Sequence, residues 1–491
     1  LAGLEELADD ALSWAAGHGV LMYKAPEAKA QATTIPFTFL PAPFAADLYW
    51  QAMEMAPTFH TLMDSVSTNL PWIQRALEVT GKMDAICGRL LGICGRVYGA
   101  GGKDPSKEIR LHMMRNDFML DVQKGRAGLP MKQIELNMIA ASFGTSRKST
   151  ATFSASLAAA LAEAHRLYER RWKASGRPRA VLFLAEADEN NEMDHRKLEA
   201  ALFRGHGVVS LRRSIRQLAA HGDPLLAPLE AAPADGASTP PSGSCSQPRR
   251  PEPRALVVDG HEVTVAYFRS GYWPGHFPSE ACWAVRERIE ESEAVKCPSA
   301  LAQLAGMKKV QQLLCEPEHL HRFLEPAKAA ELSRTFATMS DPTGESELAQ
   351  RCVRAAKDEP ENWVLKPQTE GSGELFFDAD IPPVLASRSR EELAEFILME
   401  RLRPPVTPSL VYRAEAGGGR AQPVVRASVA ELGVYGVFVA DGERVLLNRA
   451  VGHLLRSKAR HTNQGGVFVG NAVVDAPLLL PPALFWPAVS S

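Results

Sequence analysis

The sequence predicts a mixed α/β fold, and three patterns along the chain support this prediction. Residues 47–97 have mostly helical periodicity in their apolar positions. The continuous apolar run 180–185 is followed by a helical segment and by a second apolar run at 207–211, which is the order of a βαβ unit with a buried parallel strand. Residues 424–448 alternate between apolar and polar positions with short turns between them, which favours several short antiparallel strands.

Length and composition restrict the class of protein. The 491 residues are enough for two or three domains with a large core. Lys plus Arg (55) nearly balance Asp plus Glu (57), so the net charge of −2 gives no reason to expect nucleic acid as a partner. No apolar run is long enough to cross a membrane. The seven cysteines form no Cys-x-x-Cys pair, which predicts reduced thiols in a cytoplasmic compartment. The chain begins at Leu1 rather than methionine, so we expect its true N-terminus, with any organelle-targeting peptide, to be missing.

The first part of the chain predicts a helical region followed by two strands. Apolar residues over 4–15 fall on one helix face. Residues 109–122 and 131–139 have the composition of strands. The second strand carries Glu135 and Asn137 at alternate positions, so its period of two places both side chains on the same face.

The middle of the chain predicts an α/β layer with an interruption. Residues 149–174 form a long helical pattern, and Asp194 is a candidate cap for the helix that follows the buried strand. Residues 224–254 are rich in Pro, Gly, Ser and Ala, and we expect a disordered insertion there. Two further strands, 254–258 and 262–268, follow around a tight turn.

The stretch 363–373 has the strongest chemical pattern, because an apolar strand ends there in a lysine and a glycine-rich turn. Lys366 offers a compact positive charge, and the glycines of the turn allow backbone N–H groups to approach a phosphate. Glu370 has the chemistry to hold Mg²⁺ against the same phosphates. The Gly-Lys-Ser/Thr ending of a P-loop is missing. A surface turn with a solvated lysine is the alternative that this stretch leaves open.

Other charged residues lie near strand ends and extend this pattern. No Ser-His-Asp or Cys-His set stands out, so nucleophilic catalysis is not indicated. Each cation taken alone is more consistent with a solvated surface charge than with a ligand contact. Together the residues favour an ATP- and Mg²⁺-dependent enzyme. The candidates are Lys308, Lys366 and Lys458 for phosphate, Glu135, Asn137, Glu370 and Glu431 as oxygen ligands, and Arg115, Arg269 and Arg456 for carboxylates.

Several short motifs follow one another along nearly the whole chain. Among them are Arg-Asn-Asp at 115–117, Lys-Gln-Ile-Glu-Leu-Asn at 132–137, Tyr-Phe-Arg-Ser-Gly-Tyr at 267–272, Gln-Leu-Ala-Gly-Met-Lys-Lys-Val-Gln-Gln at 303–312 and Val-Gly-His-Leu-Leu-Arg-Ser-Lys at 451–458. In this order the set resembles the eukaryotic-type glutathione synthetases, which are ATP-grasp enzymes.

The resemblance implies an ATP-grasp fold with an inserted substrate-binding domain. The implied parts are a helical N-terminal part over residues 1–130, an α/β substrate-binding domain over 131–300, and a nucleotide-binding domain with glycine-rich lid loops over 301–491. It also implies a homodimer in the cytoplasm, with no nucleic acid or membrane as a partner.

The implied reaction joins two small molecules at the expense of ATP. ATP phosphorylates the C-terminal carboxylate of γ-glutamylcysteine, and the amine of glycine attacks the acyl phosphate to give glutathione, ADP and phosphate. Since anions must be held in contact, neutralisation by Mg²⁺, lysine and arginine would supply most of the catalysis. The lid loops would exclude water from the acyl phosphate.

The resemblance also implies a role for each matching residue. The implied catalytic residues are Arg456, Lys366 and Arg115, and the implied metal ligands are Glu135, Asn137 and Glu370. The implied ATP-binding residues are Glu135, Lys308, Lys366, Thr369, Glu370, Gly371, Ser372, Gly373, Phe377, Met399, Glu400, Arg401, Leu402, Glu431, Lys458 and Gln464. The implied peptide- and glycine-binding residues are Arg115, Ser142, Asn191, His195, Arg269, Ser270, Gly271, Tyr272, Arg456, Val467 and Phe468.

The chain departs from the family's pattern at several of these positions. Ser372 and Glu374 replace a glycine and an asparagine in the glycine-rich loop, and the bulky Phe468 stands where a small residue closes over substrate. Ala140 replaces a serine and His195 a glutamine near the peptide. Two alternatives follow from these changes. One is a sister ligase that uses β-alanine or serine as acceptor, and the other is a catalytically weak homologue that binds nucleotide.

Overall fold

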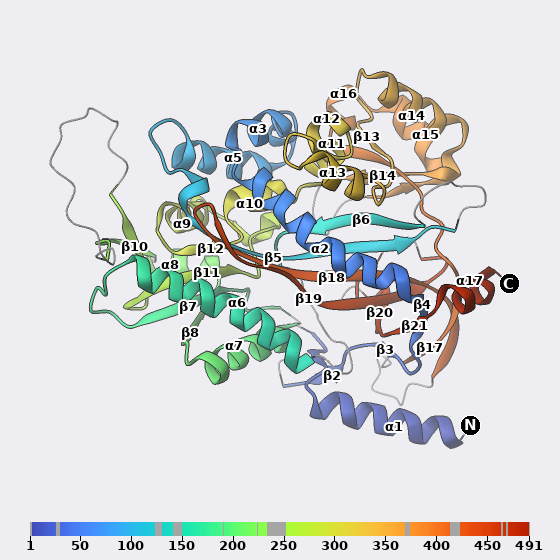
Figure 1. Cartoon of the computed structure of the whole chain (residues 1–491), viewed down its shortest axis with the longest axis horizontal. Coiled ribbons are helices and arrows are strands. Elements are labelled where there is room, and N and C mark those ends of the chain that lie inside the picture. Colours follow the sequence, from blue (N-terminus) through green and yellow to red (C-terminus); the bar gives the residue numbers. More distant parts are fainter. Residues whose placement is uncertain are drawn as a thin grey trace.

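The computed structural model describes most of the chain. The described residues are 2–25, 30–122, 130–140, 150–189, 191–222, 224–232, 252–368, 374–412, 423–462, 465–467 and 470–490. They form a seven-stranded, a six-stranded and a four-stranded sheet, together with two separate strand pairs. Helices surround these sheets (Figure 1), so the predicted mixed α/β class is confirmed.

The seven-stranded sheet combines strands from both ends of the chain. Its strands, in spatial order, are β17 (Thr407–Tyr412), β3 (Phe37–Thr38), β20 (Ala472–Asp475), β19 (Arg444–Ala459), β18 (Val424–Asp441), β5 (Ile109–Leu120) and β6 (Met131–Asn137). β18 is one long strand rather than several short ones, because antiparallel pairing with β19 on one side and β5 on the other continues along it. β18 and β19 form a hairpin that crosses the molecule.

Helices bury both faces of this sheet. α2 (Ala46–Ser67) lies across one face (Figure 1), where Leu432 and Val434 of β18 belong to its apolar core. α6 (Thr150–Arg171) packs on the opposite face, in a second core that contains Val437 and Val439. Because both faces are covered, β18 is buried at every position from Leu432 to Ala440 and does not alternate there between buried and exposed residues.

The six-stranded sheet is the predicted α/β layer. Its strands are β8 (Ser210–Arg213), β7 (Arg179–Leu184), β11 (His261–Phe268), β10 (Arg254–Val258) and β9 (Leu225–Pro228), with β12 (Val295–Cys297) parallel to β11. β7 is parallel to β8 and β11, and α7 (Glu192–His206) connects β7 to β8, so the predicted βαβ unit is confirmed. Asp194 lies in the first turn of α7 rather than at its cap, which is Asn191.

One part of the predicted insertion 224–254 is wrong. Residues 225–228 form strand β9, which pairs antiparallel with β10 and places Leu226 opposite Leu256. Pro224 precedes this strand and Pro228 is its last residue, and proline is compatible with the ends of an edge strand. Residues 233–251 of the predicted insertion lie outside the described residues.

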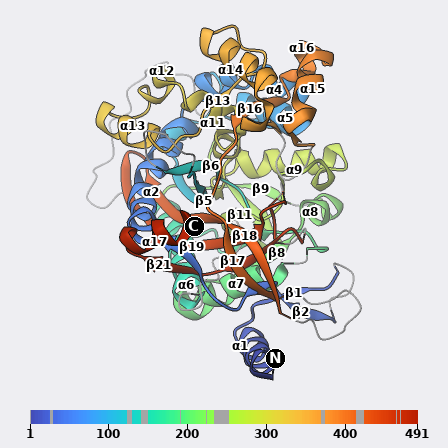
Figure 2. The same ribbon diagram turned by 90° about the vertical axis from the view of Figure 1, so that its right-hand side faces the viewer.

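The four-stranded sheet forms a small lobe at the top of Figures 1 and 2. Its strands are β13 (Met339–Ser340), β16 (Phe396–Glu400), β14 (Trp363–Pro367) and β15 (Phe376–Phe377). α14 (Glu347–Asp358), α15 (Ile381–Ser387) and α16 (Arg390–Leu393) share its apolar core. The antiparallel pair of β14 and β16 brings Lys366 opposite Ile397, which places the end of the predicted phosphate-binding strand at the edge of this lobe.

The remaining elements complete the body. The predicted helical region after Asp47 is confirmed by α2, α3 (Leu70–Ala76), α4 (Thr80–Met83) and α5 (Ala85–Tyr98). The other helices are α1 (Ala2–Gly17), α8 (Ile215–His221), α9 (Glu280–Glu291), α10 (Ala300–Ala305), α11 (Lys308–Leu314), α12 (Pro317–Leu320), α13 (Pro326–Ser333) and α17 (Pro482–Ser490). The strand pairs are β1 (Leu21–Tyr23) with β2 (Ala32–Thr34), and β4 (Ala42–Ala45) with β21 (Pro477–Leu480). Among the described helices, none has the length and apolar character that a membrane crossing requires.

Candidate functional site

A cavity of about 760 Å³ lies between the small lobe and the seven-stranded sheet. This volume is in the range of pockets that bind cofactors and drug-sized ligands. Residues that the sequence assigned to ATP, metal and catalysis converge on its wall. They are Glu135, Asn137, Lys308, Lys366, Phe377, Met399, Glu400, Arg401, Leu402, Glu431, Arg456 and Lys458.

Strand geometry accounts for this convergence. β6 presents Glu135 and Asn137 to the cavity, and β19 presents Arg456 and Lys458 in the same way. Because residues two apart point to the same face of a strand, each pair reaches the cavity together. The small lobe contributes Lys366 at the end of β14 and residues of β16, while Lys308 is the first residue of α11.

The charges in the cavity favour an anionic ligand. Burial alone would raise the pKa of Glu135, but Lys308, Lys366, Arg115 and Arg456 lower it to about 2, so this carboxylate is ionised at neutral pH. The local excess of positive charge is therefore large enough to offset burial. Lysine and arginine side chains that meet at a strand end are a common way to bind phosphate groups.

The pKa of Lys458, a cation of the same cavity, shows the same local excess of positive charge. Burial, together with the neighbouring charges of Arg456, Lys366 and Arg401, lowers the pKa of Lys458 to about 8. A bound anion would reverse this effect, because it would favour the protonated amine. The cavity is thus electrostatically prepared for a polyanion such as a nucleoside triphosphate.

Glu135 and Asn137 fit a magnesium site. Asn137 Nδ2 donates hydrogen bonds to Asp117 Oδ2 (3.1 Å) and to the carbonyl oxygen of Arg115 (3.4 Å), which leaves its amide oxygen as a ligand. An ionised carboxylate and an amide oxygen beside phosphate-binding cations are the oxygen donors that Mg²⁺ prefers. The third predicted ligand, Glu370, lies outside the described residues.

A second group of predicted residues lies where β11 ends beside α7. Arg269 Nε donates a hydrogen bond to His195 Nε2 (3.0 Å), and Arg269 Nη1 contacts Tyr267 Oη (3.3 Å). Burial and the charges of Arg269 and Arg212 hold the pKa of His195 well below its usual value, so its imidazole is neutral. Burial also raises the pKa of the nearby Glu189 to about 7. Asp194, His195, Tyr267 and Arg269 line a small cavity of about 10 Å³.

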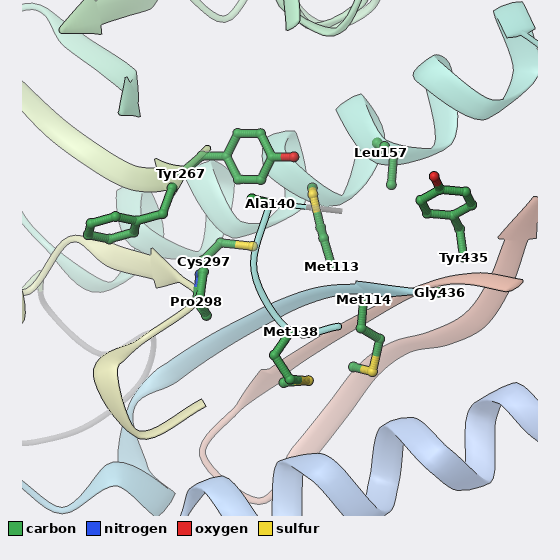
Figure 3. A pocket seen from close by; sticks show the side chains of 11 residues that line it. Met113, Met114, Met138, Ala140, Leu157, Tyr267, Cys297, Pro298, Tyr435 and Gly436 are labelled. Carbon is green, nitrogen blue, oxygen red and sulfur yellow. The ribbon is translucent and has the colours of Figure 1, made fainter. Parts of the chain in front are cut away.

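Figure 3 shows a narrow apolar cavity that shares Leu157 and Tyr267 with the cavity at Arg269. Its volume is about 10 Å³, which is roughly the space of one water molecule. Tyr267 and Tyr435 lie on opposite sides of Met113 in this view, and Cys297 points into the cavity from below Tyr267. Burial raises the pKa of Cys297 to about 12, so this thiol is protonated at neutral pH and is not an activated nucleophile.

Several predicted residues do not line the large cavity. Arg115 is buried behind its wall and holds Asp117. Ser270 donates to the carbonyl oxygen of Leu184 (3.3 Å), and Gly271 donates its N–H to His276 Nδ1 (3.0 Å), so both contribute to the loop after β11. The others in this group are Asn191 at the cap of α7, Tyr272 against the ring of His276, and the buried Val467.

Other predicted site residues fall in segments that the structure does not describe. These are Ser142, Thr369, Glu370, Gly371, Ser372, Gly373, Gln464 and Phe468. Their roles therefore stay predictions.

Sequence reasoning gave no role to Asp117, although its carboxylate contacts three of the predicted site residues. The Arg-Asn-Asp motif at 115–117 contained the signal, since period two places its first and third residues on one face of a strand.

Comparison with known proteins gives independent evidence. The model of the family described as eukaryotic glutathione synthase, ATP binding domain, matches residues 2–479. The glutathione synthetase of Xenopus laevis is 34% identical over 500 residues, which cover 97% of each chain. That of Homo sapiens is 33% identical over 497 residues, which cover 96% of each chain.

The chain belongs to the eukaryotic glutathione synthase family. This confirms the resemblance that the motifs indicated, and it places the chain among ATP-dependent ligases. The chloroplastic glutathione synthetase of Solanum lycopersicum is 32% identical over 505 residues, which cover 97% of this chain and 84% of that protein. A solved structure of a glutathione synthetase-like effector from Globodera pallida, in its apo form, has a TM-score of 0.70 and covers 97% of this chain and 96% of that chain. At 18% identity, that likeness shows that the two chains share a fold.

Proposed function

We propose that this chain ligates γ-glutamylcysteine to glycine with ATP and Mg²⁺, and forms glutathione, ADP and phosphate through an acyl phosphate. Membership of the glutathione synthase family supports the reaction. The observation that carries the proposal is the convergence of Lys308, Lys366, Arg456 and Lys458 on one cavity beside the ionised Glu135. A site that transfers a phosphoryl group between anions needs this concentration of fixed positive charge.

The residues that line the cavity form two sets, one proposed to bind ATP and one proposed to bind Mg²⁺. Lys308, Lys366 and Lys458 would bind the phosphates, and the segment 399–402 would line the nucleotide along β16. Glu135 and Asn137, with Glu370, would hold Mg²⁺, which supplies neutralisation of charge on the transferred phosphoryl group when it is bound.

The peptide would lie beside the phosphates. Arg456 lines the cavity within contact of Glu431, where its guanidinium can stabilise charge on the acyl phosphate. Arg115 and the cluster around Arg269 would bind the carboxylate groups of γ-glutamylcysteine, with His195 holding Arg269 in place. Gly465 and Gly466 lie on the cavity wall, where a closing loop would keep water from the acyl phosphate.

The same proposal covers the organisation of the protein. We propose an ATP-grasp arrangement with domain boundaries near residues 130 and 300, a homodimer, and a cytoplasmic location. Strand β5 shares its sheet with β18 and β19, so the first and last of these domains would be joined by a continuous sheet.

Product formation by the purified protein tests the reaction. ADP release would be measured with γ-glutamylcysteine, ATP and Mg²⁺, and with glycine, β-alanine or serine supplied in parallel. We expect the fastest release with glycine and glutathione as the product. Preference for another amine would identify the sister ligase, while ATP binding without release would identify a homologue that only binds nucleotide.

A pair of arginine variants on β19 tests the assigned role of Arg456. Arg456→Ala should lower kcat far more than it lowers ATP affinity, because this side chain acts on charge that develops during the reaction. Arg449→Ala is the matched control, since Arg449 lies on the same strand and is exposed. Equal losses of kcat and ATP affinity in Arg456→Ala would contradict the assignment.

A further inference from the structure

The carboxylate of Asp117 connects three strands of the site. Asp117 lies on β5 and is fully buried. Its Oδ1 accepts a hydrogen bond from Arg115 Nε (2.6 Å), and its Oδ2 accepts one from Arg115 Nη2 (2.6 Å). Oδ2 also accepts from Arg456 Nη2 on β19 (3.2 Å) and from Asn137 Nδ2 on β6 (3.1 Å). One side chain therefore contacts residues proposed for the peptide, the acyl phosphate and the metal.

Charge explains why an acid is needed at this position. Burial and the nearby charge of Arg115 both lower the pKa of Arg456, whereas Asp117 acts in the opposite direction. Two guanidinium groups that share a buried face repel each other unless an anion lies between them. Asp117 accepts hydrogen bonds from both guanidinium groups, and its bidentate contact fixes the plane of the Arg115 fork. Glu431 also contacts Arg456, and Glu135 also favours the charged form of Arg456.

The neighbouring strand leaves space for this contact. Gly433 of β18 lies directly opposite Asp117 in the register of β5 and β18. A Cβ at Gly433 would lie 2.7 Å from Asp117 Oδ1 and 2.8 Å from Arg115 Cδ. The Asp117–Arg115 pair therefore requires glycine at position 433, because any side chain there would collide with it.

We propose that Asp117, seated over Gly433, is the positioning residue that holds Arg115, Arg456 and the amide of Asn137 in their working orientations. The proposal rests on the proposed function. Asp117 itself does not line the cavity, so it acts through the side chains that it binds. Because it accepts a hydrogen bond from Asn137 Nδ2, it also fixes the orientation of that amide, whose oxygen is the proposed metal ligand.

The variant Asp117→Asn tests this role with a closely matched control. Asparagine keeps the size of the side chain but removes its charge and turns one acceptor into a donor that faces the guanidinium groups. Asp64→Asn is the control, because Asp64 is also buried and also holds an arginine of β5, with Arg110 Nε to Oδ1 at 2.7 Å and Arg110 Nη2 to Oδ2 at 3.0 Å. Asp64 does not line the cavity.

The two variants should separate in their kinetics. For Asp117→Asn, we expect kcat/KM for γ-glutamylcysteine to fall by about ten- to hundredfold, as for the loss of a charge-assisted hydrogen bond. The KM for ATP should change by less than about threefold, since the lysines remain in place. Asp64→Asn should lower the melting temperature without changing either constant. Wild-type constants in Asp117→Asn, or the same kinetic change in Asp64→Asn, would overturn the proposal.

Two readouts do not depend on turnover. Side-chain NMR of ¹⁵N-arginine-labelled protein should show the Arg115 Nε–H signal displaced in Asp117→Asn and unchanged in Asp64→Asn. Calorimetry should show weaker binding of γ-glutamylcysteine to Asp117→Asn in the presence of a non-hydrolysable ATP analogue. If the wild-type protein forms no product with any amine, the proposed function fails. If the Arg115 Nε–H signal is the same in Asp117→Asn as in the wild-type protein, the positioning role of Asp117 fails, whether or not the wild-type protein forms product.

Gly433→Ala provides a second variant that removes no charge. The added methyl group should displace the Asp117–Arg115 pair and reproduce the loss in kcat/KM for the peptide. Gly205→Ala, where a Cβ has no neighbour within 4 Å, is the matched control. An active Gly433→Ala protein with unchanged KM for the peptide would overturn the role of the pair, because the contact could then be moved without effect.

Discussion

At the scale of single residues, Lys458 connects the electrostatics of the cavity to pH. Its amine has a pKa of about 8 because of burial and of the neighbouring cations, so it is mostly protonated at pH 7. ATP phosphates favour the protonated amine. The contribution of Lys458 to ATP binding is therefore present below pH 8 and is lost as the pH rises through that value.

We predict that the KM for ATP rises above pH 8, by up to about tenfold per pH unit if only the protonated amine binds. Lys458→Arg should remove this rise, because a guanidinium remains charged throughout the range. Lys309→Arg is the control, since Lys309 pairs with Asp341 and does not line the cavity. Initial rates between pH 7 and 9.5 measure the effect. A rise that persists in Lys458→Arg would assign the titration to another group.

At the scale of elements, the close packing of α2 on β18 depends on a missing side chain. Gly436 of β18 lies under His60 of α2, and a Cβ at Gly436 would lie 1.7 Å from His60 Nε2. His60 is buried, and its Nδ1 lies 2.8 Å from Asn448 Oδ1 on β19. The helix therefore contacts the backbone of one strand and a side chain of the next.

We predict that Gly436→Ala lowers the free energy of unfolding by at least about 1–3 kcal/mol, which is the usual range for overpacking a core. The helix would have to move away from the sheet, and its contacts with both strands would weaken. Gly205→Ala in α7 should instead be neutral or stabilising by about 0.5–1 kcal/mol, since it adds helix propensity in open space. Denaturant unfolding of both proteins would show the contrast. Equal stability would mean that α2 adjusts to the methyl group at no energetic cost.

At the scale of the whole molecule, the cavity joins two sheets with separate apolar cores. Lys366 belongs to the small lobe, whereas Arg456 and Lys458 belong to the large sheet. A ligand that contacts both must stabilise them together. At a concentration of 100 times its Kd, such a ligand adds about 2.7 kcal/mol to the free energy of unfolding.

We predict that ATP with Mg²⁺ raises the melting temperature, and that chelation of the metal or Lys366→Ala removes most of the increase. Lys357→Ala is the matched control, because Lys357 is an exposed lysine of the same lobe, on α14. Differential scanning fluorimetry at increasing ATP concentrations measures the shift. An undiminished shift in Lys366→Ala would place nucleotide binding outside this cavity.

Local patterns in the sequence predicted the parts of the site that lie within one element. The alternation of Glu135 and Asn137 on β6 and the lysine at the end of β14 needed only the period of a strand. The contact of Asp117 with Arg456 joins residues 339 positions apart. It depends on strand pairing that no local pattern contains.

The same limit explains the errors in the fold. The prolines around β9 indicated a loop, because their compatibility with a sheet edge depends on which strands are neighbours. Gly433 and Gly436 weaken the strand pattern in the sequence, so residues 424–448 favoured several short strands in place of the long strand β18. Gly433 and Gly436 are explained by Asp117 and His60, which approach from distant parts of the chain.

The order of strands in the large sheet also has a consequence for synthesis on the ribosome. β5 pairs along its length with β18, where Phe118 lies opposite Leu432. At about 5–20 residues per second, the roughly 300 residues between them take about 15–60 s to emerge. During this time β5 has an edge of unpaired backbone N–H and C=O groups where β18 will later pair. Until β18 emerges, the nascent chain must therefore either cover this edge of β5 with another segment or leave the sheet unformed. The phosphate-binding site cannot form until β18 and β19 have been synthesised.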